Sequence, residues 1–146
     1  MTERPARPSP ARTWLRASLF LLATVQLTIG IWQLFSPRSF FDMPWVAALP
    51  PYNEHLMRDL GAMNLALAIM LGAAAYVSER RLTYVALLAY LAFNLPHLAF
   101  HTTHFGHQSA ASARALVAVL ALGVLWPGAL FAALCLGRVR LSPRCD

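Results

Sequence analysis

Four polar residues recur at helical spacing in the second half of the chain: Asn94, His97, His101 and His104. At about 100° per residue, they fall within an arc of roughly 80° on one helix face. Imidazole nitrogens bind zinc and iron, and imidazole also gains and loses a proton near neutral pH. This histidine face therefore predicts chemistry of one of two kinds, metal binding or the transfer of a proton or polar substrate.

A second polar group lies forty residues earlier, where Glu54 precedes Arg58 and His55 precedes Asp59 by four residues. Side chains at this spacing meet on a helix. A carboxylate beside histidines could complete a metal site, so the candidate metal ligands are His97, His101, His104 and Asp59. The whole candidate polar cluster comprises Glu54, His55, Arg58, Asp59, Asn94, His97, His101 and His104.

Three interpretations of this cluster stay open at the level of sequence. The first is a hydrogen-bonded network with a purely structural role, the second is a zinc or iron site, and the third is a site for protons or substrate. No complete H-E-x-x-H signature occurs. Pro96 removes the backbone hydrogen bond to the Ala92 carbonyl where the histidine face begins, and interrupted helices often line sites in transporters.

The elements that must position these residues are membrane helices. Of the 146 residues, 58% are apolar and only 12% are charged, about half the charged fraction of a soluble domain. Four apolar stretches each reach the ~20 residues that span a bilayer, and residues 116–134 carry no ionisable side chain on any face. The expected fold is all-α, a four-transmembrane-helix bundle over residues 14–140, with spans at about 14–35, 56–77, 82–103 and 113–137.

The arginines predict the orientation of these spans. The net charge of +6 arises from twelve arginines and six acids, and cytoplasmic loops are the ones enriched in arginine. Nine arginines precede the first span, fill the second connection or follow the last span: Arg4, Arg7, Arg12, Arg16, Arg80, Arg81, Arg138, Arg140 and Arg144. We therefore expect a multi-pass protein of the bacterial cytoplasmic (inner) membrane, N-in and C-in, in contact with the lipid bilayer and not with nucleic acid. Residues 1–13 are expected to form a disordered cytoplasmic tail, and residues 141–146 a second tail.

Small and polar residues predict how the helices pack. Gln26, Gly30 and Gln33 recur on one face of the first span, so this face should contact other helices. In the second span, residues 62 and 66 and residues 68 and 72 are small pairs that would let backbones approach. The short connection at 78–81 makes spans two and three an antiparallel hairpin. Arg58 and His101 lie the same number of residues before and after this turn, so they should lie side by side. The sequence therefore predicts one shared polar cluster.

The start of the second span also carries a family resemblance. Residues 54–62 read Glu-His-Leu-Met-Arg-Asp-Leu-Gly-Ala, and with the four-span layout they resemble the DoxX-like group of small four-helix bacterial membrane proteins. The resemblance implies an architecture and no particular activity.

Two function classes follow from these observations. The first is an accessory or transport-related membrane component with a His, acid and Arg cluster on the outer side. Such a component is expected to form a homo-oligomer or to bind a membrane partner subunit, because four thin helices enclose little volume. The alternative is a zinc- or iron-dependent membrane-embedded enzyme that uses the same cluster.

Overall fold

A computed structural model of the chain describes residues 9–139 and 141, and throughout that part the regular structure is helical. Four long helices cover Pro10–Phe35 (α1), Glu54–Val77 (α4), Arg80–His101 (α5) and Ala110–Cys135 (α6). Two short helices, Pro37–Phe41 (α2) and Pro44–Ala47 (α3), lie in the first connection. All four long helices have the length and hydropathy needed to cross a membrane. The expected all-α bundle of four apolar helices is confirmed.

Helix α1 begins earlier than the sequence predicted, at Pro10 rather than at residue 14. The Ser9 side chain accepts a hydrogen bond from the Arg12 backbone N–H at 3.4 Å, and proline suits the first helical position because its missing N–H would have no helical partner there. Residues 10–13 are therefore helical and do not belong to a disordered tail. The rest of that predicted tail lies outside the described residues, as do all residues of the predicted C-terminal tail except Leu141.

The other bounds differ from the expected spans by two or three residues. Helix α4 begins at Glu54 because the Asn53 side chain caps it, accepting from the Leu56 N–H at 3.0 Å. Helix α5 begins at Arg80, where the Glu79 carboxylate accepts from the N–H groups of Arg81 and Leu82. Side-chain caps satisfy backbone donors that a helix leaves unpaired, so they set these ends.

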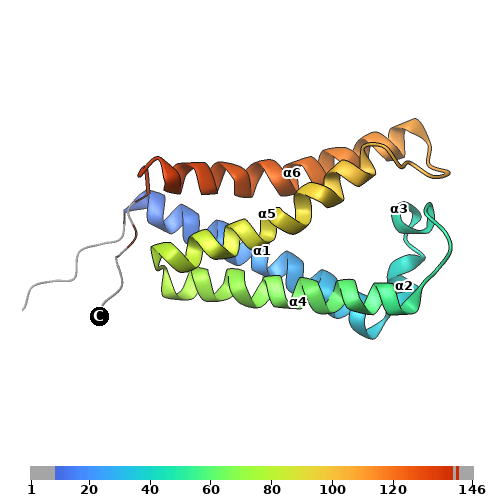
Figure 1. Cartoon of the computed structure of the whole chain (residues 1–146), viewed down its shortest axis with the longest axis horizontal. Helices are drawn as coiled ribbons and strands as arrows, with labels where there is room; N and C mark the ends of the chain where they lie inside the picture. The colour runs from blue at the N-terminus through green and yellow to red at the C-terminus, as the bar shows by residue number, and fades with distance from the viewer. Residues whose placement is uncertain (1–8, 140, 142–146) are drawn as a thin grey trace, which may run out of the picture.

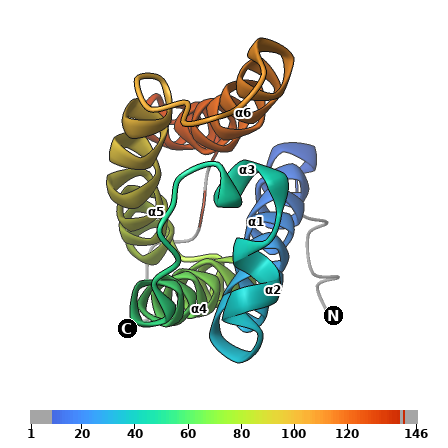
Figure 2. The same ribbon diagram turned by 90° about the vertical axis from the view of Figure 1, so that its right-hand side faces the viewer.

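The helices follow one another around the bundle in the order α1, α4, α5, α6 (Figure 2). Helices α1 and α4 share the most extensive interface, followed by α5 with α6 and then α4 with α5. Helices α2 and α3 lie over one end of the bundle (Figure 1). We call this end, formed by residues 36–53 and 102–109, the loop end. The opposite end, at the Ser78–Glu79 turn, is the hairpin end.

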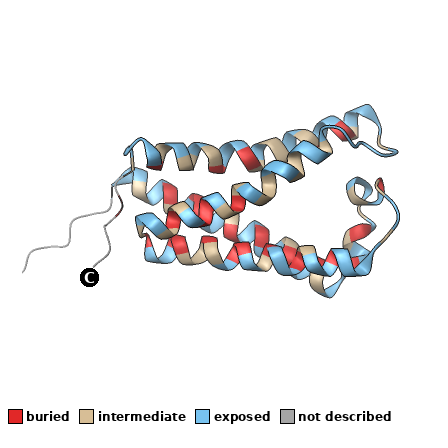
Figure 3. Ribbon diagram, in the orientation of Figure 1, coloured by how far each residue is buried: buried red, intermediate tan, exposed pale blue. Residues whose placement is uncertain are grey.

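The apolar core lies toward the hairpin end, where all four long helices contribute to it. Leu15 of α1, Leu71 of α4, Leu87 of α5 and Leu134 of α6 are each at most 2% exposed. Buried residues become sparse along α5 and α6 toward the loop end (Figure 3). The bundle is thus tightly packed at one end and looser at the other.

Helices α1 and α4 touch through their backbones at two glycines. A Cβ placed on Gly61 would lie 2.8 Å from the Leu34 nitrogen and 3.0 Å from the Gly30 oxygen. One turn away, the Asn64 side chain donates to the Gln33 Oε1 at 2.7 Å, and both residues are 5% exposed. The predicted inward face of Gln26, Gly30 and Gln33 is confirmed, because all three are buried.

The small residues of α4 divide between two faces. Ala68 is buried and Gly72 faces Ala23 of α1, as the spacing predicted. Ala62 and Ala66, however, are exposed and do not form the helix contact. Gly61 lies next to Ala62 in sequence but about 100° away around the helix, and its lack of a side chain permits the closer approach that the structure uses.

Helix α5 leaves α4 halfway along its length. Its buried residues, Thr83, Ala86, Leu87 and Tyr90, all lie in the half near the hairpin end. Beyond Tyr90 the helix crosses toward α6, as Figure 1 shows. This divergence determines where the histidine face lies.

Candidate functional site

The polar residues of α4 form a compact group at the start of that helix. Arg58 makes an ion pair with Glu54 at 2.8 Å, and His55 Nε2 lies 3.4 Å from the Asp59 carboxylate. Both pairs join residues four apart, as the sequence spacing indicated. Their side chains are 45–86% exposed, so these are surface pairs that contribute little to stability.

Arg58 also connects α4 to α1. Its guanidinium donates to the Leu34 carbonyl, in the last turn of α1. The final carbonyls of a helix have no helical donor and carry partial negative charge. An arginine there donates the missing hydrogen bond and supplies a compensating positive charge. Arg58 therefore has a structural task that its sequence position did not reveal.

His97 and His101 of α5 form a second group with His104, which lies in the loop just beyond the end of that helix, and ring contacts hold the group together. The rings of His97 and His101 lie 4.7 Å apart edge to face, and Phe93 stacks on His97 at 5.7 Å. Phe100 stacks on His104 at 4.1 Å and meets His101 edge to face at 5.5 Å. Ring contacts thus link the three histidines, directly between His97 and His101 and through Phe100 between His101 and His104. We call these three residues, with Asn94, the histidine row.

Hydrogen bonds satisfy only part of this row. Asn94 donates to the Tyr90 carbonyl at 2.9 Å, and His104 Nδ1 lies 3.1 Å from the Phe100 carbonyl. His97 and His101 are half-buried. The His101 Nδ1 is fully buried and has no hydrogen-bond partner within the part of the chain that the structure describes. An unpaired buried ring nitrogen costs free energy, so it marks a place where a polar partner would bind favourably.

The two polar groups do not meet. Among residues 54–59 and 94–104, all of which are described, no hydrogen bond, ion pair or ring contact joins α4 to α5. Counting residues from the hairpin turn correctly placed both groups toward the loop end. The prediction of contact also required α4 and α5 to stay adjacent along their whole length. Because α5 turns from α4 to α6 beyond Tyr90, the shared cluster does not form in this structure.

The candidate metal ligands are likewise separated. Over residues 9–139 and 141, no three His, Cys, Asp or Glu side chains come close enough to hold a metal ion. His97 and His101 follow one another along one face of α5, His104 lies beyond the end of that helix, and Asp59 instead contacts His55. Zinc sites of known type need at least three protein ligands converging on one point, so the predicted ligand set does not assemble here.

Two features with functional potential were missed at the level of sequence. The first is the contact of Gly30 with Gly61, which neither segment reveals alone because it depends on how the helices are rotated. The second is Arg114, which lines a cavity between the loop that follows α5 and the start of α6. The sequence alone could have indicated Arg114 as a candidate, because it is the one ionisable residue between Ala110 and Leu134. Charged residues within membrane spans often have a function.

Comparison with protein-family models, with curated proteins and with solved structures found no match for this chain.

Proposed function

We propose that this chain is an accessory or transport-related protein of the bacterial cytoplasmic membrane, and that the His97–His101 pair accepts and releases a proton in that role. The observation that carries the proposal is the contact of these two rings, 4.7 Å apart, beside a buried His101 ring nitrogen without a partner. Histidine is the side chain whose unperturbed titration lies nearest physiological pH. Two imidazoles so close repel each other when both are charged, so a proton on one ring disfavours a proton on the other.

The length of the row supports a role in transfer. From Asn94 to His101 the polar residues cover about 10 Å along the helix axis, at 1.5 Å per residue. That distance is about a third of the ~30 Å hydrocarbon layer. The row continues through His104 into the loop end. With the N-in, C-in orientation that the arginines favour, a proton would enter this row from the outer side.

We further propose that a second copy or a membrane partner subunit completes the path. The half of α5 near the loop end, which carries the polar residues Asn94, His97 and His101, contains no buried residue. A single copy offers the proton no continuation toward the hairpin end, where the core is closely packed leucine and alanine. The likeness to DoxX-like proteins at residues 54–62 agrees with this architecture, and membership of that group is part of the proposal.

The metal-dependent enzyme has no comparable support. Its four ligands lie on two helices that diverge, and no contact joins Asp59 to the histidine row within residues 54–104, all of them described. We therefore advance the transport-related role as the function that the geometry supports best.

The test is proton flux into liposomes that contain the purified protein and a trapped pH-sensitive dye. A potassium diffusion potential, positive outside, should drive proton entry through the wild-type protein. Replacing both His97 and His101 by alanine should reduce this flux about tenfold or more, since removing a proton-transfer group commonly costs 10²–10⁴-fold. His107, an exposed residue of the loop end, provides the control, and His107→Ala should conduct as the wild type does. Equal flux from the double variant and the wild type would contradict the proposal. No flux above empty liposomes would contradict completion of the path by a second copy and would leave the membrane partner subunit as the required component.

A further inference from the structure

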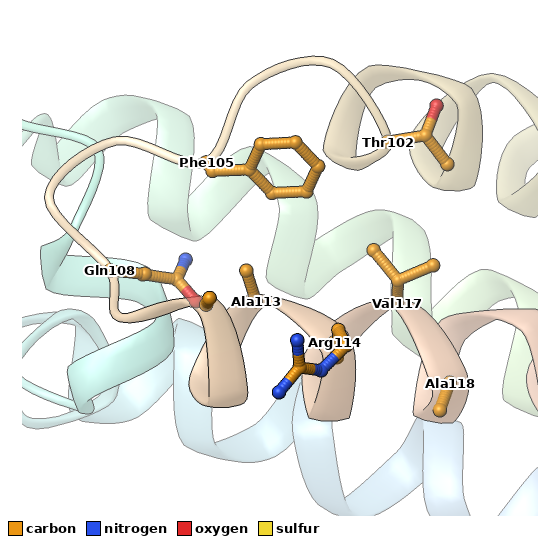
Figure 4. A pocket seen from close by; sticks show the side chains of 8 residues that line it. Thr102, Phe105, Gln108, Ala113, Arg114, Val117 and Ala118 are labelled. Atoms are coloured by element: carbon orange, nitrogen blue, oxygen red, sulfur yellow. The ribbon is translucent and has the colours of Figure 1, made fainter.

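A cavity of about 620 Å³ lies between the loop that follows α5 and the first turns of α6. Its walls are mainly apolar, with Phe105 from the loop on one side and Ala113 and Val117 from α6 on the other (Figure 4). Gln108 and Arg114 supply polar groups at its edge. Its size falls within the 300–1,000 Å³ typical of sites for small molecules.

Contacts with the first connection hold the loop wall in place. Gly106 has φ +57°, and a Cβ there would lie 2.0 Å from the Ala48 carbonyl oxygen, so only glycine fits this turn. The His107 N–H donates to the same carbonyl at 3.4 Å, and Gln108 Nε2 donates to the Trp45 carbonyl at 3.4 Å. The first connection therefore supports, from behind, the loop that forms one wall of the cavity.

Arg114 has an uncompensated charge. The other two arginines toward this end of the bundle have acidic partners, Arg38 with Asp42 at 3.0 Å and Arg58 with Glu54 at 2.8 Å. Arg114 has no ion pair or hydrogen bond with any side chain or carbonyl of the described residues. It also lies at the end that the distribution of arginines leaves poor in positive charge, so the orientation rule does not account for it.

Arg114 lies near the start of α6, where its side chain can extend back to the headgroup region of a bilayer. It lies four residues into α6, about 6 Å from the helix start at 1.5 Å per residue. An arginine near a helix end extends its guanidinium toward the headgroups while its stem stays against apolar groups. The cavity thus has a cation at headgroup depth and an apolar wall that continues toward the membrane interior.

We propose that this cavity binds an anionic phospholipid of the bilayer. The phosphate pairs with the Arg114 guanidinium, beside the Gln108 side chain. The upper part of one acyl chain lies against Phe105, Ala113 and Val117. A water-soluble anion would leave the apolar wall unused, and a zwitterionic lipid would bring its own cation close to Arg114. A lipid with a net negative charge pairs with the Arg114 guanidinium and also covers the apolar wall of the cavity.

The experiment measures lipid binding to the purified full-length protein by native mass spectrometry from a neutral detergent. The probes are dioleoylphosphatidylglycerol, dioleoylphosphatidylcholine and inorganic phosphate, each added alone. We expect one phosphatidylglycerol to bind about tenfold more tightly than phosphatidylcholine, because the choline ammonium of phosphatidylcholine repels the Arg114 guanidinium and offsets the attraction of the phosphate. Inorganic phosphate should not bind measurably.

Three variants separate the parts of the site. Arg114→Gln should reduce phosphatidylglycerol affinity about tenfold, to the level of phosphatidylcholine. Arg38→Gln removes an arginine from the same end that is already paired with Asp42, and it should leave binding unchanged. Ala118→Phe fills the apolar side of the cavity from an exposed position while keeping Arg114, and it should also weaken binding.

Several results would overturn the proposal. One is unchanged phosphatidylglycerol affinity in Arg114→Gln, and another is an equal loss in Arg38→Gln, which would show attraction to the general charge of the protein. Binding of inorganic phosphate that Ala118→Phe leaves intact would show a site for free anions instead of lipid. The proposal uses neither His97 nor His101, so its failure would leave the proposed proton transfer untouched.

Discussion

At the scale of single residues, the backbone contact between α1 and α4 depends on Gly30 and Gly61, because a side chain of a single hydrogen atom lets the two backbones touch. Inside a bilayer, burying apolar surface gives little driving force, because lipid tails are as apolar as leucine. Helices are held together by close van der Waals contact and by hydrogen bonds between helices. Gly30 and Gly61 supply the first and the Gln33–Asn64 pair supplies the second, one turn apart.

Substituting Gly61 by alanine should destabilise the protein by about 1–3 kcal/mol, the usual range for overpacking. The added methyl would lie 2.8 Å from the Leu34 nitrogen and 3.0 Å from the Gly30 oxygen, and neither backbone atom can move alone. The measurement is the free energy of unfolding in mixed micelles titrated with a denaturing detergent. Gly128 of α6 is the matched control because a Cβ there meets nothing within 4 Å. If Gly128→Ala destabilised the protein as much as Gly61→Ala, close approach would not be the reason.

The Gln33–Asn64 hydrogen bond should show a measurable coupling energy. We expect Gln33→Ala and Asn64→Ala to be non-additive by about 0.6–1.7 kcal/mol, the range found for hydrogen bonds between membrane helices. A double-mutant cycle of unfolding free energies isolates this energy. Full additivity would show that the two amides contribute separately, Asn64 through its 3.0 Å bond to the Leu60 carbonyl.

The sequence was most informative where periodicity alone decides the outcome. The inward face of Gln26 and Gln33 and the histidine row both follow from 3.6 residues per turn. The partner of each polar residue was not predictable, because it depends on the rotation and crossing of whole helices. Arg58 illustrates this limit, since its sequence neighbours indicated the pair with Glu54, but nothing local indicated the Leu34 carbonyl.

At the scale of helices, the course of α5 decides whether one polar cluster or two form. The tight turn at Ser78 fixes the helices only at the hairpin end, where Thr83 and Leu87 are buried. Beyond Tyr90 the helix carries Asn94, Pro96, His97 and His101, and none of its residues in this part is buried. Equal counting from a turn gives the depth of a residue, but it gives no lateral distance between helices that diverge.

Because the two groups do not touch, Asp59→Ala and His101→Ala should have additive effects on stability. Mutations without shared partners add within about 0.3–0.5 kcal/mol. The measurement is again a double-mutant cycle in mixed micelles, with His97 and His101 as the matched pair, whose rings do touch. Coupling of Asp59 to His101 clearly above that range, at the level of the His97–His101 pair, would show that the shared cluster forms in the membrane.

At the scale of the whole molecule, the bundle is asymmetric from end to end. The hairpin end is closed by a leucine and alanine core to which all four helices contribute, whereas the loop end carries the histidine row, the α4 ion pairs and the Arg114 cavity. Both sites that we propose therefore face the same side of the membrane. The side of the membrane that the loop end faces determines where protons enter and which leaflet supplies the lipid.

The distribution of arginine predicts that the loop end faces outward. Arg80 and Arg81 flank the hairpin turn, whereas Arg38 and Arg58 at the loop end each have an acidic partner. The orientation rule counts arginines and lysines near the span ends and gives acids little weight. Nine arginines against three then favour the hairpin end as the cytoplasmic one.

Labelling of single cysteines in intact cells tests this orientation. In a background with Cys135 and Cys145 replaced by alanine, a membrane-impermeant maleimide should label His107→Cys at the loop end. Arg81→Cys at the hairpin end should react only after the cells are permeabilised. Each of these positions is exposed, so failure to react reports the membrane barrier and not burial. The reverse pattern would place the histidine row and the Arg114 cavity on the cytoplasmic side, and protons would then enter the row from the cytoplasm.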